Sequence, residues 1–422
     1  MKELLVYQGP VSSRSGYGDH ARDVLRSFIK MDRFNIKVVD TPWGACPRNG
    51  LDKERDKDIT DLFLTQNLSQ RPDVFVQVSI PSEFNPHGKF NIGITAGIES
   101  TLVHQSWLAG MNKMDMNIVP SVHSKAVFEN TTYDMFDDNR NKIGVMKSEK
   151  PIEVLFEGAD LSIFDSKIPV PEKIDSTLSN IKEDFNFLFV GHWLQGDLGH
   201  DRKDIGMLIK TFCETFAGTG KKPGLILKTS NATFSVIDRE NLKDKIQKIK
   251  NSIGKNNLPN IYLLHGDLSP EEMNGLYNHK KVKAHISFTK GEGYGRPLLE
   301  ASLSGKPVIA SGWSGHVDFL KEHSIMLPGS VNQVHPSAAN EWIMKESGWF
   351  TVDYQYSAKV LKDVFKDYKK YADKTRKQKH HSKTNFSLEV MDKKLAELVD
   401  EKIVKKVEMV MPKINLPKLK KV

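Results

Sequence analysis

The chain has 422 residues, which is too long for one ordinary hydrophobic core and suits two domains. Its 39% apolar and 27% charged residues exclude a largely disordered protein. Cys46 and Cys213 belong to no metal-binding or disulfide pattern, so we expect free thiols in a reducing, cytoplasmic compartment. The first residues are typical of a strand rather than a signal peptide. The sequence has no apolar run of about 18 residues, so we expect no transmembrane helix.

The formal net charge of +8 is concentrated at the C-terminal end. Residues 360–422 hold 18 Lys or Arg against 9 Asp or Glu, so this segment carries +9 and the remaining 359 residues carry −1. Such a Lys-rich segment is either a solvated surface or a contact for an anionic partner such as DNA or a membrane surface. The sequence leaves both interpretations open.

Short β-branched or aromatic segments alternate with helix-compatible stretches, which is typical of parallel sheets with crossover helices. In the first half, strands are predicted at residues 3–8, 35–40, 73–79, 91–95, 116–119 and 152–156. In the second half, strands are predicted at residues 186–191, 224–229, 260–264, 284–288, 307–310 and 325–327. Each half therefore has enough strands for its own doubly wound, Rossmann-like sheet.

A polar segment separates the two halves. Residues 164–183 contain Pro169 and Pro171 and show no clear apolar period, so they suit a linker. We place the boundary near residue 170, which gives domains at 1–170 and 171–385.

The last segment, residues 386–422, combines a predicted helix with the basic tail. Ser387 suits the N-cap of this helix. An apolar stripe follows at helical spacing and needs a surface to pack on. The stripe consists of Met391, Leu395, Leu398 and Val399.

The most informative segment is residues 289–301, which follow the predicted strand 284–288. Its three glycines let the backbone approach a ligand closely, Pro297 suits the start of a helix, and the free N–H groups of a helix start attract phosphate. Glu292 and Glu300 would both face the carboxyl edge of the sheet, where open α/β folds bind ligands. Because a carboxylate accepts two hydrogen bonds, each suits a diol such as a ribose or a sugar ring.

Two other interpretations of this segment are weaker. A plain glycine-rich turn would not explain both carboxylates beside a strand–loop–helix anion site. A glycosidase would need Glu292 and Glu300 to flank one bond, whereas Glu300 beside a phosphate-binding loop fits a ribose better.

The motif Glu-x7-Glu, here EGYGRPLLEASLSGKPVIAS, resembles the signature of family 4 glycosyltransferases, which are retaining enzymes of the GT-B fold. Other parts of the family's pattern occur in the expected order over most of the chain. They are the Gly-rich loop at residues 15–18, the segment PIEVLFEGADLSIFD at 151–165, and FVGHW followed by Arg202-Lys203-Asp204. The resemblance implies two Rossmann-like domains facing a cleft, with the final helix crossing back to the N-terminal domain. It makes 1–170 the acceptor-binding domain and 171–385 the nucleotide-sugar-binding domain.

The resemblance also implies roles for individual residues. Glu292 would contact the donor sugar and Glu300 the nucleotide ribose, while the loop between them cradles the diphosphate. Lys203, predicted just inside the helix after the strand 186–191, sits where the family has a diphosphate-binding lysine, with Arg202 beside it. A positioned cation stabilises the negative charge of a leaving diphosphate more in the transition state than in the ground state. The remaining donor-binding residues are Gly16, Tyr17, Gly18, His192, Gly293, Tyr294, Gly295 and Arg296.

In the N-terminal domain, Gly16 and Gly18 precede a helix predicted to begin near Asp19. The resemblance implies that these two glycines face the donor phosphates across the cleft. Where the family often has a histidine near the reacting sugar, Glu99 stands at the comparable position. We interpret Glu99 as either an acceptor-side catalytic group or a helix cap.

Three other polar features are interpreted as structural. His104 and His123 are expected to be surface or packing residues. The sequence Asp56-Lys57-Asp58 matches a metal-binding DxD, but no apolar strand precedes it, so we read it as a helix start and expect no metal ion.

The predicted reaction is transfer of a sugar from a nucleoside diphosphate sugar. We expect a UDP- or GDP-sugar as the donor and no further cofactor. Retention of configuration would follow from attack on the face that the diphosphate leaves, with the diphosphate taking the acceptor's proton. The acceptor, which in this family is a glycan, lipid, small metabolite, protein or modified DNA base, is not specified by the sequence. Residues 43–55 and 134–150 are expected to shape its entry. The alternative is an inactive nucleotide-sugar-binding protein recruited to an anionic partner by its basic tail.

Overall fold

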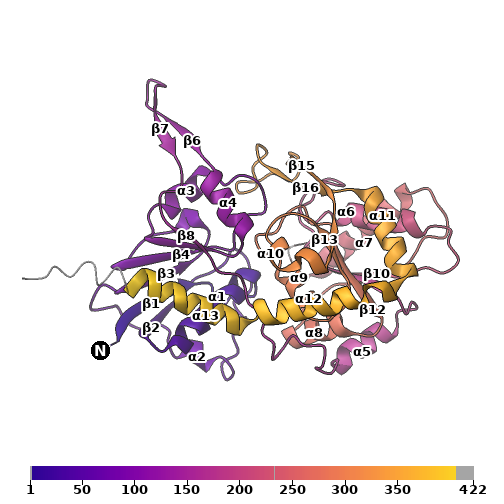
Figure 1. Ribbon diagram of the computed structural model, residues 1–422, viewed down its shortest axis with the longest axis horizontal. Helices are drawn as coiled ribbons and strands as arrows, with labels where there is room; N and C mark the ends of the chain where they lie inside the picture. Colours follow the sequence, from indigo (N-terminus) through magenta and orange to yellow (C-terminus); the bar gives the residue numbers. More distant parts are fainter. Residues whose placement is uncertain (1, 232, 405–422) are drawn as a thin grey trace, which may run out of the picture.

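The computed structural model describes residues 2–231 and 233–404, and it consists of two α/β lobes side by side (Figure 1). Residues 405–422, the end of the predicted basic tail, lie outside the described part. Each lobe is built around one six-stranded parallel sheet.

The first sheet has the strand order β2-β1-β3-β4-β5-β8. Its four inner strands are buried along most of their length, because crossover helices cover both faces of a parallel sheet. The six strands are β1 (Glu3–Gly9), β2 (Phe34–Asp40), β3 (Val74–Val78), β4 (Phe90–Ile94), β5 (Met116–Val119) and β8 (Ile152–Val154).

The second sheet has the order β11-β10-β9-β12-β13-β14, which is the Rossmann order. Its strands are β9 (Asn186–Val190), β10 (Gly224–Lys228), β11 (Ile261–Leu264), β12 (Val282–Ser287), β13 (Val308–Ser311) and β14 (Ile325–Leu327). Every strand that the sequence predicted is present, and the two Rossmann-like sheets confirm the predicted fold class.

Helices connect these strands in both lobes. Those of the first lobe are α1 (Gly16–Met31), α2 (Lys57–Thr60), α3 (Gln105–Met111) and α4 (Val122–Asn130). Those that follow are α5 (Glu172–Ser179), α6 (Ile205–Phe216), α7 (Val236–Ser252), α8 (Pro270–Asn278), α9 (Arg296–Ser302), α10 (Val317–Leu320), α11 (Tyr354–Lys366), α12 (Ala372–Asn385) and α13 (Leu388–Val399). No helix in the described ranges is long and apolar enough to cross a membrane.

Two hairpins were not predicted. The hairpin of β6 (Tyr133–Phe136) and β7 (Lys142–Met146) projects away from the first lobe (Figure 1). The second hairpin pairs β15 (Gly329–Gln333) with β16 (Gly348–Val352). Because β15 is exposed along its whole length, its sequence carries no apolar pattern that would predict a strand.

The predicted linker is partly helical, which corrects the expectation of an irregular segment at residues 164–183. Helix α5 begins at Glu172 and buries Ile174 and Leu178, which lie four residues apart on one face and pack in the domain core. This pair was too short a pattern to be recognised. The predicted boundary near residue 170 falls between β8 and α5.

Helix α13 leaves the second lobe and packs on α1 of the first (Figure 1). Ser387 is its N-cap, as predicted, and accepts a hydrogen bond from the amide of Val390. Met391, Leu395 and Val399 are fully buried. The predicted return of the final helix to the N-terminal domain is therefore confirmed.

Much of the basic segment that the structure describes is neutralised locally. Lys379 and Lys383 contact Asp165, while Arg376 and Lys377 contact Asp373. These pairs favour a structural use of the charge between residues 360 and 404.

Candidate active site

The two loops that carry most of the predicted site residues leave the second sheet at its topological switch point. The strand order runs in opposite directions from β9 and from β12, which are neighbours in the sheet. The loop after β9 holds Arg202 and Lys203, and the loop after β12 holds Glu292. Open α/β sheets bind their ligands at such a crevice.

Four predicted catalytic residues meet where the two domains touch. The Lys203 ammonium forms an ion pair with Glu292. The Arg202 guanidinium lies 3.3 Å from a Glu292 carboxylate oxygen and 3.6 Å from Glu99 of the N-terminal domain. The structure therefore brings Glu292, Lys203, Arg202 and Glu99 together, and their chemical roles remain predictions.

The Lys203–Glu292 pair is shielded from water, with the two side chains only 10% and 9% exposed. Burial opposes ionisation of Glu292, but the charges of Lys203 and Arg202 outweigh it and lower the pKa of Glu292 to about 2. Glu292 is therefore an anion at neutral pH. A buried cation pair beside it is suited to receive another anion.

Lys203 lies before α6, so the prediction that it falls just inside that helix is wrong. Helix α6 begins at Ile205, and its N-cap Asp204 has φ 53° and ψ 37°. This left-handed conformation cannot continue a right-handed helix. Lys203 consequently reaches Glu292 from the turn that precedes the helix.

The Gly-rich loop after β12 packs directly against the N-terminal domain. A Cβ atom on Gly291 or Gly293 would overlap the carbonyl oxygens of Glu99 and Ala96. The Gly293 carbonyl also accepts a hydrogen bond of 2.6 Å from the Ser121 hydroxyl. These glycines are therefore required for contact between the domains, a requirement that the sequence did not reveal.

Gly295, Tyr294 and Arg296 occupy different environments. Gly295 is the N-cap of α9 with φ 97°, a conformation that favours glycine. Tyr294 is 2% exposed and its ring packs against Phe319. The Arg296 guanidinium donates to Asp23 of α1 at 2.7 Å and bridges the two domains.

Glu300, the second carboxylate of the motif, lies in α9 with its side chain 11% exposed. It accepts hydrogen bonds from the Tyr277 hydroxyl at 3.1 Å and from Arg296 at 3.3 Å. Burial raises the pKa of Glu300 to about 7, although Arg296 and Tyr277 oppose the rise.

This raised pKa predicts a pH-dependent stability. The folded protein keeps a proton on Glu300 up to about pH 7, whereas the unfolded chain releases it near the ordinary value of 4.5. The contribution of this carboxyl to stability is therefore complete below pH 4.5 and is lost as the pH rises through 7. We expect Glu300→Gln, which mimics the protonated carboxyl at every pH, to gain stability relative to the wild type between pH 5 and pH 8. Urea unfolding at both pH values measures this gain.

Glu322→Gln is the control, because Glu322 is exposed. A stability difference between Glu300→Gln and the wild type that does not change with pH would show that Glu300 titrates normally.

In the N-terminal domain, α1 begins at Gly16, not near Asp19 as predicted, because the Ser15 side chain caps the helix by accepting from the amide of Gly18. A Cβ on Gly18 would overlap the Ser13 carbonyl, whereas one on Gly16 would meet no atom within 4 Å. Position 18 therefore requires glycine for packing, whereas position 16 has open space for a Cβ atom.

The side chains of Tyr17 and His192 form hydrogen bonds with other residues of the protein. The Tyr17 hydroxyl bonds Thr95 at 2.9 Å and accepts from the amide of Ala96 at 3.1 Å, and its ring stacks on Trp43. The His192 ring bonds Ser230 at 3.0 Å. Burial, together with Lys203 and Arg202, lowers the pKa of His192, which keeps the imidazole neutral beside these cations.

The residues that the sequence analysis interpreted as structural form helix caps, ion pairs or ring contacts. Asp56 is the N-cap of α2, and the carboxylates of Asp56 and Asp58 both contact Arg26. His104 caps α3, and His123 packs edge-on against Trp313. In the ranges 2–231 and 233–404, no group of three or more His, Cys, Asp or Glu is placed to hold a metal ion.

Sequence reasoning missed several supporting residues. The Ser314 hydroxyl accepts a hydrogen bond of 2.9 Å from the Glu292 amide. Tyr277 contacts Glu300, and Asp23 contacts Arg296. These residues lie far from the motif in sequence, and no local pattern marks them. Asp204 and Lys290 were detectable only as neighbours of the motif residues.

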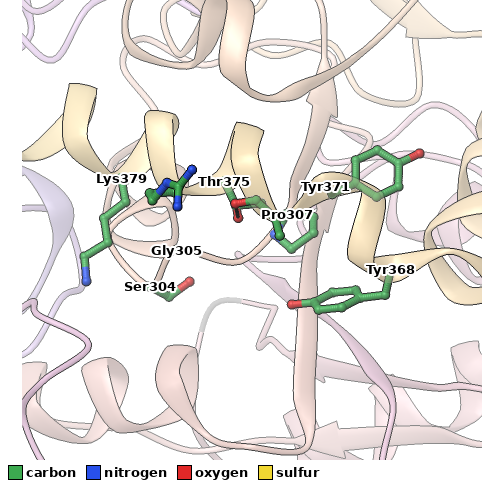
Figure 2. Close-up of a pocket in the computed structure, with 9 residues that line it drawn as sticks. Ser304, Gly305, Pro307, Tyr368, Tyr371, Thr375 and Lys379 are labelled. Atoms are coloured by element: carbon green, nitrogen blue, oxygen red, sulfur yellow. Dashed lines mark hydrogen bonds between the residues drawn. The ribbon is translucent and has the colours of Figure 1, made fainter.

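In the part of the chain that the structure describes, the second lobe has cavities that are not lined by Glu292 or Glu300. One, of about 370 Å³, is bordered by Lys290, Trp349 and Tyr354. Another, of about 360 Å³, lies at the amino edge of the sheet, where Tyr368, Thr375 and Lys379 surround residues 304–307 (Figure 2). At the predicted donor crevice, the Gly-rich loop is in direct contact with the N-terminal domain.

Several solved structures share the two-lobed fold of this protein over nearly its whole length. A glycosyltransferase from Rickettsia africae aligns with a TM-score of 0.62 at 16% identity, covering 96% of this chain and 99% of the other. A sucrose-phosphate synthase from Thermosynechococcus elongatus aligns with a TM-score of 0.63 at 12% identity, covering 96% and 100%. HepE from Anabaena, solved in complex with UDP-glucose, aligns with a TM-score of 0.59 at 13% identity, covering 94% and 100%. At sequence identities this low, the structural similarity establishes a common fold and nothing further.

Two Rossmann-like domains and these neighbours define the class of the protein as GT-B. Residues 219–347, which include Glu292 and Glu300, match the family of glycosyl transferases group 1. The C-terminal domain therefore contains a segment that is similar to glycosyl transferases group 1. No curated protein sequence matches the chain significantly.

Proposed function

We propose that the protein is a retaining, metal-independent glycosyltransferase of family 4 that uses a UDP- or GDP-sugar. The convergence of Lys203, Arg202, Glu292 and Glu99 at the switch point carries this proposal. HepE, which shares the fold, is described in complex with UDP-glucose, and this supports a UDP-sugar as the first donor to test. The free thiols of Cys46 and Cys213 are compatible with a reducing, cytoplasmic compartment.

In the proposed reaction, the bond between the anomeric carbon and the diphosphate oxygen breaks while the acceptor oxygen bonds to that carbon on the same face. The departing diphosphate oxygen takes the acceptor's proton. Lys203 and Arg202 stabilise the charge that develops on the diphosphate, so they act more strongly in the transition state than in the ground state. For this, the donor diphosphate must compete with Glu292 for the Lys203 ammonium.

A donor screen tests the activity directly. Incubation with UDP-, GDP- and ADP-sugars should release the nucleotide from one donor slowly in the absence of acceptor, as measured by a coupled assay for free nucleotide. A donor that raises the melting temperature but never releases nucleotide would indicate an inactive sugar-nucleotide-binding protein and would overturn the proposal.

Glu300→Gln tests the assignment of the ribose contact. Glutamine replaces one acceptor oxygen of the carboxyl with an NH2 donor and would leave a ribose hydroxyl without its acceptor, which costs about 1–3 kcal/mol. We therefore expect the donor KM to rise about 10- to 100-fold with a smaller change in kcat. Initial rates across donor concentrations measure the two constants. Glu322→Gln serves as the matched control, and an unchanged donor KM in Glu300→Gln would remove Glu300 from the ribose site.

A further inference from the structure

A second ion pair lies directly behind the candidate active site. Asp204 is 0% exposed and Lys290 is 1% exposed, and the Lys290 ammonium lies 3.3 Å from an Asp204 carboxylate oxygen. Tyr354 donates to the same oxygen at 2.7 Å, and Lys290 also donates to Thr351 at 3.0 Å. Removing two charges from water is costly, and such a pair often adds nothing to stability compared with apolar residues. Its presence calls for another explanation.

The two ends of this pair belong to the two segments that bear the candidate catalytic groups. Asp204 directly follows Lys203, and Lys290 stands two residues before Glu292. A backbone hydrogen bond of 2.7 Å, from the Lys290 amide to the Arg202 carbonyl, joins the same segments. The loops after β9 and β12 are thus connected at the backbone, by the buried pair, and by the Lys203–Glu292 contact.

The backbone at Asp204 adds an independent observation. Its φ of 53° is unfavourable for a residue other than glycine, and such conformations persist only where the surroundings enforce them. Lys290 and Tyr354 hold the Asp204 side chain in place. Because Asp204 is the residue that turns the chain from Lys203 into α6, its conformation decides where the Lys203 ammonium lies.

Strand β16 supports Lys290 from the other side. The Phe350 amide donates to the Lys290 carbonyl at 2.9 Å, and the neighbouring Thr351 holds its ammonium. At the start of this strand, Gly348 and Thr101 of the N-terminal domain exchange hydrogen bonds of 2.8 and 2.9 Å. The same strand therefore contacts the segment of Lys290 and the segment that carries Glu99.

We propose that Lys290 and Asp204 are positioning residues, which set the distance between the Lys203 ammonium and Glu292 and thereby the place where the leaving diphosphate is stabilised. The inference rests on the proposed transferase function. In this role, each side chain acts through the loop that it holds rather than by contact with the substrate. Catalytic groups must be held within about 0.5 Å of the productive geometry, and a buried ion pair between the two loops does this without occupying the site.

Three variants test the proposal: Asp204→Asn, Lys290→Met and the double variant. Asparagine keeps the shape of Asp204 and tolerates its left-handed backbone. We expect each single variant to lower kcat about 10- to 100-fold while the donor KM changes less than about threefold, because a misplacement of about 1 Å can cost 100-fold in rate. The alkaline limb of the kcat–pH profile should move to lower pH, since Lys203 loses part of its contact with Glu292.

Asp56→Asn is the matched control, because Asp56 is also a buried carboxylate in an ion pair, with Arg26, but lies outside the site. It should keep the wild-type kcat and pH profile. If a single variant does not fold, the double variant leaves no unpaired buried charge and should fold, yet still show the lower kcat.

The outcomes separate this inference from the proposed function. Folded Asp204→Asn or double variants with the wild-type kcat and pH profile would overturn the positioning role, provided that the wild type is active and Lys203→Met is not. A wild type that transfers no sugar from any nucleotide donor would instead overturn the proposed function.

Discussion

Replacing Lys203 with methionine is expected to lower kcat by about 100- to 1000-fold, the range seen when one preorganised group that stabilises developing charge is removed. Methionine keeps the length and apolar stem of the side chain but has no charge. Because the ammonium interacts more strongly with the departing diphosphate than with the intact donor, the loss should fall mainly on kcat rather than on the donor KM. Steady-state rates with the donor identified by the screen measure both constants.

Lys210→Met is the control for this variant. Lys210 lies on α6, a short distance along the chain from Lys203, and forms a surface pair of 2.8 Å with Glu214. Its replacement should leave kcat unchanged, because exposed ion pairs contribute about 1 kcal/mol or less to stability and this one lies outside the site. A folded Lys203→Met protein with the wild-type kcat would exclude Lys203 from the stabilisation of the leaving group.

Lys203→Met also removes one of the two cations that contact Glu292. Arg202 then remains, 3.3 Å from the same carboxylate. Because Lys203 is the larger of the two charge effects that lower the pKa of Glu292, the variant should raise this pKa. The acid limb of the kcat–pH profile of the residual activity should move to higher pH in the same direction.

The strands were predictable because they are buried on both faces. A segment such as Met116–Val119 is buried at every position and is apolar except for Asn117, so its sequence favours a buried strand. The hairpin strand Gly329–Gln333 is exposed at every position and depends on its pairing with Gly348–Val352, which lies elsewhere in the sequence. A pattern read along one segment cannot show such a partner.

The candidate site likewise has some features that the sequence predicted and others that it did not. The strand–loop–helix pattern placed Glu292 at the carboxyl edge of the sheet, and the family resemblance placed Lys203 in the same site. The structure joins the two side chains. The contact between Arg296 and Asp23 links residues 273 positions apart and depends on how the two domains dock. The packing requirement at Gly18 likewise comes from the fold of the preceding loop. Tertiary contacts of this kind leave no local pattern in the sequence.

The helix that crosses between the domains should contribute strongly to stability. Leu395→Ala is expected to lower the free energy of unfolding by about 2–5 kcal/mol, because Leu395 is fully buried between α13 and α1 and a cavity would remain. Urea or thermal unfolding measures the loss. Lys393→Ala on the same helix is the control, since Lys393 is 69% exposed and forms only a surface pair with Glu389.

This loss should extend beyond a single domain, because α13 continues from α12 of the second lobe but packs on the first. The polar contacts at its edge, from Ser27 and Lys30 to Asp392, hold the helix in register on α1. Ending the chain after Phe386 would remove these contacts and expose the apolar face of α1, so the shortened protein should unfold at lower temperature and lose activity together. If the shortened protein, or Leu395→Ala, keeps the wild-type stability and activity, α13 does not couple the two domains in solution.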